Sequence, residues 1–125
     1  MKKIGIIGAM EVEVASLKSA MQVSRMLQKA QMEFLEGELE GCQVVVVRSG
    51  IGKVNAAVCT QILVDEFGVD GVINTGIAGS LKAEINIGDI VLSTDVLHHD
   101  MDATGFGYKP GQIPQMNVFS FEADA

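Results

Sequence analysis

The sequence has few of the features that attach a protein to nucleic acid or to a membrane. Only nine lysines and arginines stand against sixteen acidic residues, and the net charge is −7. Nucleic acids and anionic membrane surfaces are bound by basic patches, whereas these basic residues are scattered along the chain. No apolar run approaches the roughly 20 residues that cross a bilayer. We therefore expect binding to neither nucleic acid nor a membrane.

Cysteine and proline are also scarce, and tryptophan is absent. Cys42 and Cys59 have the spacing of neither a CxxC motif nor a zinc site, so two free thiols are the simpler interpretation. The start of the chain shows no signal-peptide cleavage pattern, and together these absences favour a cytoplasmic protein. Both prolines, Pro110 and Pro114, lie in a glycine-rich segment that we expect to be a loop.

What remains is the composition of a globular protein. Of 125 residues, 48% are hydrophobic and 20% are charged, which suits one modest core. Hydrophobic periodicity predicts strand, helix, hairpin, helix, strand, loop and strand in that order. The predicted ranges are 3–8, 11–21, 32–39 with 42–48, 53–67, 71–75 and 89–96. This order is typical of an α/β fold with a mixed central sheet flanked by helices.

The last six residues, "SFEADA" (120–125), have the pattern of a helix beginning. Ser120 would be the N-cap, with Glu122 and Asp124 in the first turn. A domain rarely ends at such a position. We therefore expect residues 1–125 to be a fragment, the N-terminal portion of a longer domain.

Three glycine turns follow three of the predicted strands, at Gly8, at 50–52 and at 76–79. In open α/β sheets, ligands bind beyond the carboxyl ends of the strands, where glycine permits close approach of the backbone. The turns predict a shared ligand cleft, although each can also be only a tight turn.

The segment "SGIGKVN" (49–55) can be compared with two kinds of phosphate-binding loop. It fails as a Walker loop, because Val47 and Val54 replace the required glycine and hydroxyl residue. A dinucleotide fingerprint stays open, with Asp70 at a suitable distance, although Asn55 replaces its third glycine.

Glu11 and Glu13 stand at the start of the first predicted helix. The helix dipole stabilises a carboxylate there by up to about 1 kcal/mol, which is sufficient reason for either residue. A carboxylate in the cleft would also repel phosphate and could act as a general base toward water. Because the two side chains point in different directions, we expect at most one to enter the cleft.

Two motifs near the C-terminus each have two interpretations. In "HHDMD" (98–102), the alternating His98, Asp100 and Asp102 would share one side of an extended segment, but we favour a polar loop over a metal site. In "GFGY" (105–108), Phe106 and Tyr108 could form an aromatic lid or a dimer contact, or simply pack within the loop.

Taken in order, these motifs resemble the N-terminal half of the 5′-methylthioadenosine/S-adenosylhomocysteine nucleosidases, of the purine nucleoside phosphorylase superfamily. The matching segments are "KIGIIGAMEVEV" (3–14), "SGIGKVNAA" (49–57), "INTGIAGSL" (73–81), "IGDIVLSTDV" (87–96), "HHDMDATGFGY" (98–108) and "GQIP" (111–114). The resemblance covers nearly the whole chain. It implies a phosphorylase/hydrolase-like α/β fold, of which this chain is a truncated part.

The resemblance also implies an activity and its residues. The family hydrolyses the N-glycosidic bond of both nucleosides and releases adenine, in methionine salvage, without a metal or an organic cofactor. Glu13 matches the glutamate that helps to activate the attacking water. Positions near the nucleoside are matched by Met10, Ile51, Ala78 and Gly79. Residues lent across a homodimer interface to the 5′-alkylthio pocket are matched by Phe106, Tyr108 and Pro114.

The resemblance has two departures. Ile77 stands where some members have a small polar residue, so contacts near the base can differ. The family's other half carries the acid that protonates adenine, the glutamate that binds the ribose hydroxyls and an aromatic that stacks on the base. We therefore expect this chain alone to be inactive. A phosphorylase of the same superfamily and a non-catalytic nucleoside-binding or assembly module remain alternatives.

Overall fold

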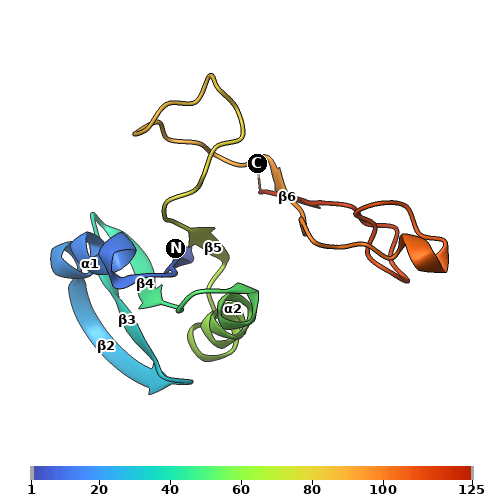
Figure 1. Cartoon of the computed structure of the whole chain (residues 1–125). Coiled ribbons are helices and arrows are strands. Elements are labelled where there is room, and N and C mark those ends of the chain that lie inside the picture. Colours follow the sequence, from blue (N-terminus) through green and yellow to red (C-terminus); the bar gives the residue numbers. More distant parts are fainter. Residues whose placement is uncertain (1, 125) are drawn as a thin grey trace. The chain divides into compact units, whose positions relative to one another are not determined.

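The computed structural model of the protein describes residues 2–124, which form two compact units (Figure 1). The first unit extends to Gly79 and the second begins at Ser80. The elements of the first unit are β1 (Lys3–Gly8), α1 (Glu11–Ala20), β2 (Gln22–Lys29), β3 (Met32–Leu39), β4 (Cys42–Arg48), α2 (Lys53–Phe67) and β5 (Gly71–Asn74). The second contains β6 (Asp95–Val96), a single 3-10 turn (Thr104–Phe106) and β7 (Phe121–Glu122).

The first unit is built on a five-stranded sheet with the order β2-β3-β4-β1-β5. Strand β1 lies in parallel between β4 and β5, while β2, β3 and β4 form an antiparallel meander. The sheet is therefore mixed, and the predicted α/β fold is confirmed. The predicted hairpin turn is also confirmed, because Glu40 and Gly41 both have positive φ, as a tight two-residue turn requires.

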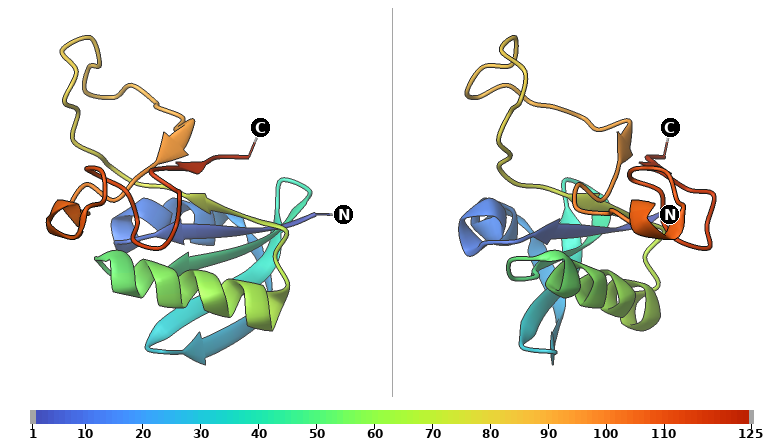
Figure 2. Two further views of the ribbon diagram at one scale, coloured as in Figure 1. Left: turned by 90° about the vertical axis from the view of Figure 1, so that its right-hand side faces the viewer. Right: turned by 45° about the vertical axis from the view of Figure 1, so that its right-hand side comes forward.

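The four valines of β4, Val44–Val47, are all buried and divide between two hydrophobic cores. Val45 and Val47 pack with α2, whereas Val44 and Val46 pack with α1. Successive strand residues point to opposite faces, so this alternation puts the two helices on opposite sides of the sheet (Figure 2). A strand covered on both faces needs the continuous apolar run that the sequence contains.

Helix α2 is apolar nearly all round, as the sequence predicted, but the described part of the chain covers only one side of it. Cys59, Leu63 and Phe67 are buried against the sheet. Val54 and Val64 remain exposed on the helix surface. The helix ends at Gly68, whose φ of 59° provides the left-handed C-cap that glycine favours.

Strand β2 was missed in the sequence analysis. Gln22–Lys29 is an edge strand whose side chains are mostly exposed, so its apolar residues do not alternate as in a half-buried strand. Its turn to β3 uses Ala30 and Gln31, both with positive φ, instead of the glycine that usually marks a hairpin. Pairing with β3 therefore determines this strand, and its local sequence gives no clear signal.

Two predictions for the second unit are wrong. Among the described residues, the strand predicted over 89–96 is reduced to Asp95–Val96, and Ile90 and Leu92 are about 90% exposed. The helix predicted from Ser120 is absent among the described residues, because Phe121–Glu122 pairs with β6 instead; residue 125 lies outside the description. A few residues cannot repay the cost of nucleating a helix, whereas pairing supplies hydrogen bonds at once.

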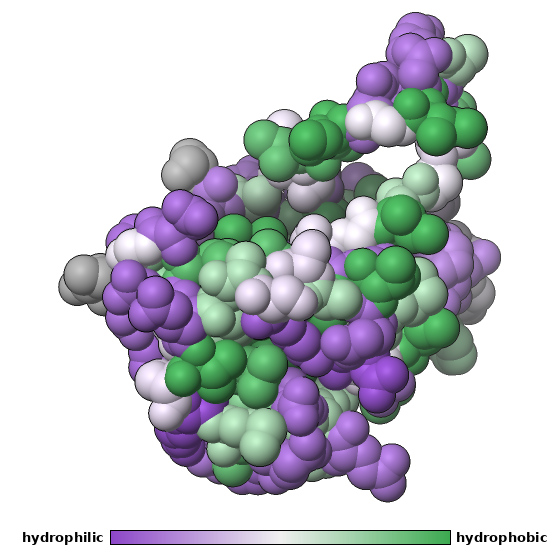
Figure 3. Space-filling model, turned by 90° about the vertical axis from the view of Figure 1, so that its left-hand side faces the viewer, coloured by the Kyte–Doolittle hydropathy of each residue, from purple (hydrophilic) through white to green (hydrophobic). Residues whose placement is uncertain are grey.

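Apolar side chains are exposed over much of the second unit, among them Leu81, Ile87 and Phe106. Green apolar areas also interrupt the polar surface on the face shown in Figure 3. Within residues 2–124, no helix is long and apolar enough to cross a membrane.

Candidate functional site

The three glycine turns meet at one edge of the sheet. Strands β1, β4 and β5 are mutually parallel through β1, so their carboxyl ends lie together. The amide of Ser49 donates to the carbonyl of Gly8 at 2.9 Å, which joins the loop after β4 to the end of β1. The amide of Thr75 donates to the carbonyl of Ile7 at 2.9 Å and joins the loop after β5 to the same strand. The predicted common location of the three turns is therefore present.

Glu13 lies at this edge, in the first turn of α1, and both of its carboxylate oxygens accept a backbone hydrogen bond. Oε2 accepts from the amide of Met10 at 2.9 Å, and Oε1 accepts from the amide of Ile77 at 3.1 Å. The first bond closes the start of α1 onto its N-cap. The second reaches 64 residues along the chain, to the turn after β5.

These hydrogen bonds keep Glu13 ionised. They lower the pKa of its carboxyl, with the amide of Met10 as the largest cause, followed by the amide of Ile77. Burial opposes the shift, and the amide of Ala9 adds to it. A carboxylate that stays charged can accept a proton from water and stabilise nearby positive charge.

Two glycines leave room for this carboxylate. A Cβ at Gly76 would lie 2.5 Å from Oε1 of Glu13, closer than a carbon and an oxygen can approach. A Cβ at Gly8 would lie 2.7 Å from Cγ1 of Val14 and 3.1 Å from the Cβ of Glu13. Glycine at these positions thus lets the turns after β1 and β5 close around Glu13.

A pocket of about 490 Å³ opens beside this site, between the loops after β1 and β4. Met10 and Ile51 both line it, together with Asn55. Asn55 also holds the loop in place, because its Nδ2 donates to the carbonyl of Ile51 at 2.8 Å. Two of the predicted nucleoside-contacting residues therefore share one cavity wall, and Met10 connects that wall to Glu13.

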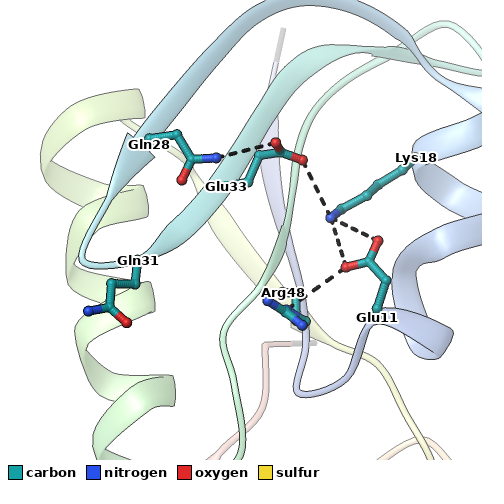
Figure 4. Close-up of a pocket in the computed structure, with 6 residues that line it drawn as sticks. All are labelled: Glu11, Lys18, Gln28, Gln31, Glu33 and Arg48. Carbon is teal, nitrogen blue, oxygen red and sulfur yellow. Dashed lines mark hydrogen bonds and ion pairs between the residues drawn. The ribbon is translucent and has the colours of Figure 1, made fainter.

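Glu11 has a different environment from Glu13. It is exposed, and its carboxylate forms an ion pair with Lys18 at 3.1 Å (Figure 4). Nε of Arg48 lies 3.9 Å from Oε2 of Glu11, and Lys18 also approaches Glu33. Glu11 also lines the pocket of about 490 Å³ with Met10 and Ile51, whereas Glu13 is not among the residues that line it. Glu11 thus belongs both to a surface charge network and to the pocket wall.

Of the other predicted nucleoside contacts, neither Ala78 nor Gly79 is among the residues that line this pocket. Ala78 and Gly79 are exposed and follow the Ile77 amide that binds Glu13. Phe106, Tyr108 and Pro114 belong to the second unit, where Phe106 is exposed and the Tyr108 hydroxyl accepts a hydrogen bond from the Gln115 amide at 3.3 Å.

The "HHDMD" segment forms a local turn. Oδ1 of Asp102 accepts from the amide of Thr104 at 3.0 Å and from its hydroxyl at 2.6 Å. The hydroxyl bond is the larger cause of a lowered pKa at Asp102, followed by the amide bond. Among the described residues, no three His, Cys, Asp or Glu side chains gather in a way that could hold a metal ion.

The sequence model of the phosphorylase superfamily matches residues 3–125, nearly the entire chain. This chain belongs to that superfamily.

Particular members are very similar to this chain. A curated 5′-methylthioadenosine/S-adenosylhomocysteine nucleosidase from Pseudoalteromonas translucida (strain TAC 125) is 53% identical over 113 residues, 90% of this chain and 48% of the relative. The crystal structure of such a nucleosidase from Colwellia psychrerythraea 34H, in complex with adenine, has a TM-score of 0.91 and 50% identity, covering 97% of this chain and 50% of that one.

A third comparison gives the same picture. The nucleosidase from Neisseria meningitidis, solved in complex with methylthio-immucillin-A, has a TM-score of 0.92 and 44% identity, covering 99% of this chain and 53% of that one. The chain thus spans about half the length of the curated relatives it matches. The predicted resemblance to these nucleosidases is confirmed, over about half of their length.

Sequence analysis missed the backbone groups of the site. It noted Ile77 as a departure in side chain, whereas the structure uses its amide. It treated Asn55 only as a replaced glycine, although Asn55 fastens the loop that carries Ile51. The available signals were two glycines, since Gly50 lies against the side chain of Asn55 and Gly76 lies against the carboxylate of Glu13.

Proposed function

We propose that this chain supplies the water-activating part of a nucleosidase that hydrolyses 5′-methylthioadenosine and S-adenosylhomocysteine to adenine and the corresponding thioribose. The observation that carries the proposal is the carboxylate of Glu13, held by the amides of Met10 and Ile77. Met10 in turn lines a pocket together with Ile51. The names of the relatives, at about 50% identity, indicate the substrates.

The chemistry assigns Glu13 a defined step. The bond between the ribose C1′ and the adenine nitrogen breaks, its electron pair leaves with adenine, and the sugar becomes oxocarbenium-like. The carboxylate of Glu13 stabilises that positive charge and takes a proton from the water whose oxygen bonds to C1′. Protonation of adenine needs a separate acid, and we assign no residue of this chain to it.

Met10, Ile51, Ala78 and Gly79 are proposed to contact the nucleoside, and no metal or organic cofactor takes part. A negative charge at Glu13 also disfavours phosphate, which supports hydrolysis over phosphorolysis. We further propose a cytoplasmic homodimer in which Phe106, Tyr108 and Pro114 cover the partner's 5′-alkylthio pocket, with methionine salvage as its role. Phe106 is exposed, and a residue that contacts a partner chain must be accessible on the surface of its own chain.

The decisive experiment measures adenine release from both nucleosides, with and without phosphate. It uses the 125-residue chain and a chimera in which this chain replaces the matching half of the Pseudoalteromonas translucida relative. We expect phosphate-independent release by the chimera, and a rate lower by at least about 10²-fold for the chain alone, because general-acid catalysis contributes that much. Strict phosphate dependence would support the phosphorylase alternative. Tight nucleoside binding without turnover by the chimera would support the non-catalytic module.

A further inference from the structure

The turn after β5 is joined to Glu13 by two features that concern one carboxylate oxygen. The amide of Ile77 donates to Oε1 at 3.1 Å. The neighbouring Gly76 presents a bare Cα to the same oxygen, since a Cβ there would lie 2.5 Å from Oε1. The hydrogen bond therefore depends on the absence of a side chain at position 76.

The second carboxylate oxygen is held independently of that turn. Oε2 accepts from the amide of Met10, which belongs to the same helix start as Glu13. That bond fixes one oxygen but leaves the carboxylate free to rotate about it. Because Ile77 is 64 residues away in sequence, its amide fixes the carboxylate relative to β5 as well.

We propose that Gly76 and the amide of Ile77 form a latch that sets the orientation of the Glu13 carboxylate for its reaction with water. This inference rests on the proposed function for its catalytic consequence. Gly76 and Ile77 are positioning residues here, since they act through Glu13. The side chain of Ile77 has no part in the latch, because it is 85% exposed.

The latch places different requirements on residues 76 and 77. Any residue except proline supplies the same amide, so the side chain at 77 is free to vary. Position 76 has no such freedom, because even the smallest side chain would enter the space that Oε1 occupies. The structural requirement therefore falls on Gly76 and on the backbone of Ile77.

The first test is a carbon-13 NMR titration of the Glu13 side-chain carboxyl in the 125-residue chain. Gly76→Ala should displace Oε1 and break the Ile77 bond, so the pKa of Glu13 should rise toward that of an ordinary glutamate. Gly79→Ala is the matched control in the same loop, since a Cβ there meets nothing within 4 Å. An unchanged pKa in a folded Gly76→Ala protein would overturn the proposal.

A second pair of variants acts on the donor and keeps Gly76. Ile77→Pro removes the amide hydrogen, whereas Ile77→Ala keeps it and removes only an exposed side chain. We expect a raised pKa of Glu13 in the first and a wild-type titration in the second. Equal titrations in the two variants would contradict the latch even if Gly76→Ala fails to fold.

Catalysis supplies the last readout. In the chimera described above, Gly76→Ala should lower kcat by about 10²-fold, as a displacement of a reacting group by about 1 Å can do, with a smaller change in KM. The acid limb of the pH profile of kcat/KM should also move to higher pH in this variant, because it follows the raised pKa of Glu13. If the chimera hydrolyses neither nucleoside, the proposed function fails, and the NMR titration still decides the latch.

Discussion

Gly5 in the middle of β1 lies directly under Leu63 of α2, so that a Cβ at position 5 would be 2.8 Å from Cδ1 of Leu63. Leu63 is fully buried among Ile7, Val45 and Phe67 and has no room to move aside. The missing side chain at Gly5 thus lets α2 pack close to the sheet.

Gly5→Ala is therefore expected to destabilise the first unit by about 1–3 kcal/mol, the usual cost of overpacking a core. Gly71→Ala is the matched control in the neighbouring strand, where a Cβ meets only Cδ1 of Ile4 at an ordinary 3.7 Å. Urea unfolding followed by circular dichroism measures both. A stability equal to that of the control would show that α2 shifts without cost.

Gly37 gives a second stability prediction, at the irregularity in the β2–β3 pairing. A Cβ at Gly37 would overlap the backbone carbonyl of Gln22, where the register shifts between Val23 and Arg25. Because a backbone carbonyl cannot rotate away as a side chain can, Gly37→Ala should release the start of β2 from the sheet. Hydrogen exchange should then speed up in β2 while β1 keeps its protection. Unchanged exchange in β2 would contradict this account.

The two cysteines should differ strongly in reactivity. Burial raises the pKa of the Cys59 thiol to about 11, whereas Cys42 is exposed at the start of β4. The thiolate is the reactive form of cysteine. A thiol reagent at pH 8 should therefore modify the exposed Cys42 quickly and the buried Cys59 only on unfolding. Cys42→Ser should remove the fast phase and leave the slow one. A persisting fast phase in that variant would place Cys59 within reach of solvent.

The two glutamates at the start of α1, Glu11 and Glu13, should differ in how much each contributes to the rate of hydrolysis. In the chimera, Glu13→Gln should nearly abolish hydrolysis while nucleoside binding persists, because the amide cannot accept the proton from water. Glu11→Gln should be much milder, since Glu11 pairs with Lys18 on the surface and its loss removes only a partly exposed ion pair. Near wild-type turnover of Glu13→Gln would refute its role.

The pH dependence of the wild-type chimera has a definite sign. Because hydrogen bonds lower the pKa of Glu13, its basic form persists to lower pH than that of an ordinary glutamate. The acid limb of kcat/KM assigned to this group should therefore lie below the usual glutamate range, with activity lost as pH falls through the lowered pKa. An acid limb above that range would mean that another group controls it.

Local pattern in the sequence was enough to predict the buried elements. The valine run of β4 and the apolar helix α2 have strong signals as continuous apolar segments of strand and helix length, because β4 is buried on both faces and α2 packs against the sheet. The glycine turns also predicted that three loops meet at one end of the sheet, since parallel strands place their carboxyl ends together. The resemblance to a known family then singled out Glu13, Met10 and Ile51 as candidate site residues.

Only the tertiary structure decided the features that depend on distant partners. Strand β2 exists because β3 pairs with it, and the predicted strand 89–96 shrinks to Asp95–Val96, the two residues that pair with β7. The hydrogen bond between Glu13 and the amide of Ile77 joins residues 64 positions apart, and a backbone donor leaves no mark in the side-chain sequence. Edge strands and backbone contacts are set by what folds beside them, so the sequence alone could specify the carboxylate but not the group that orients it.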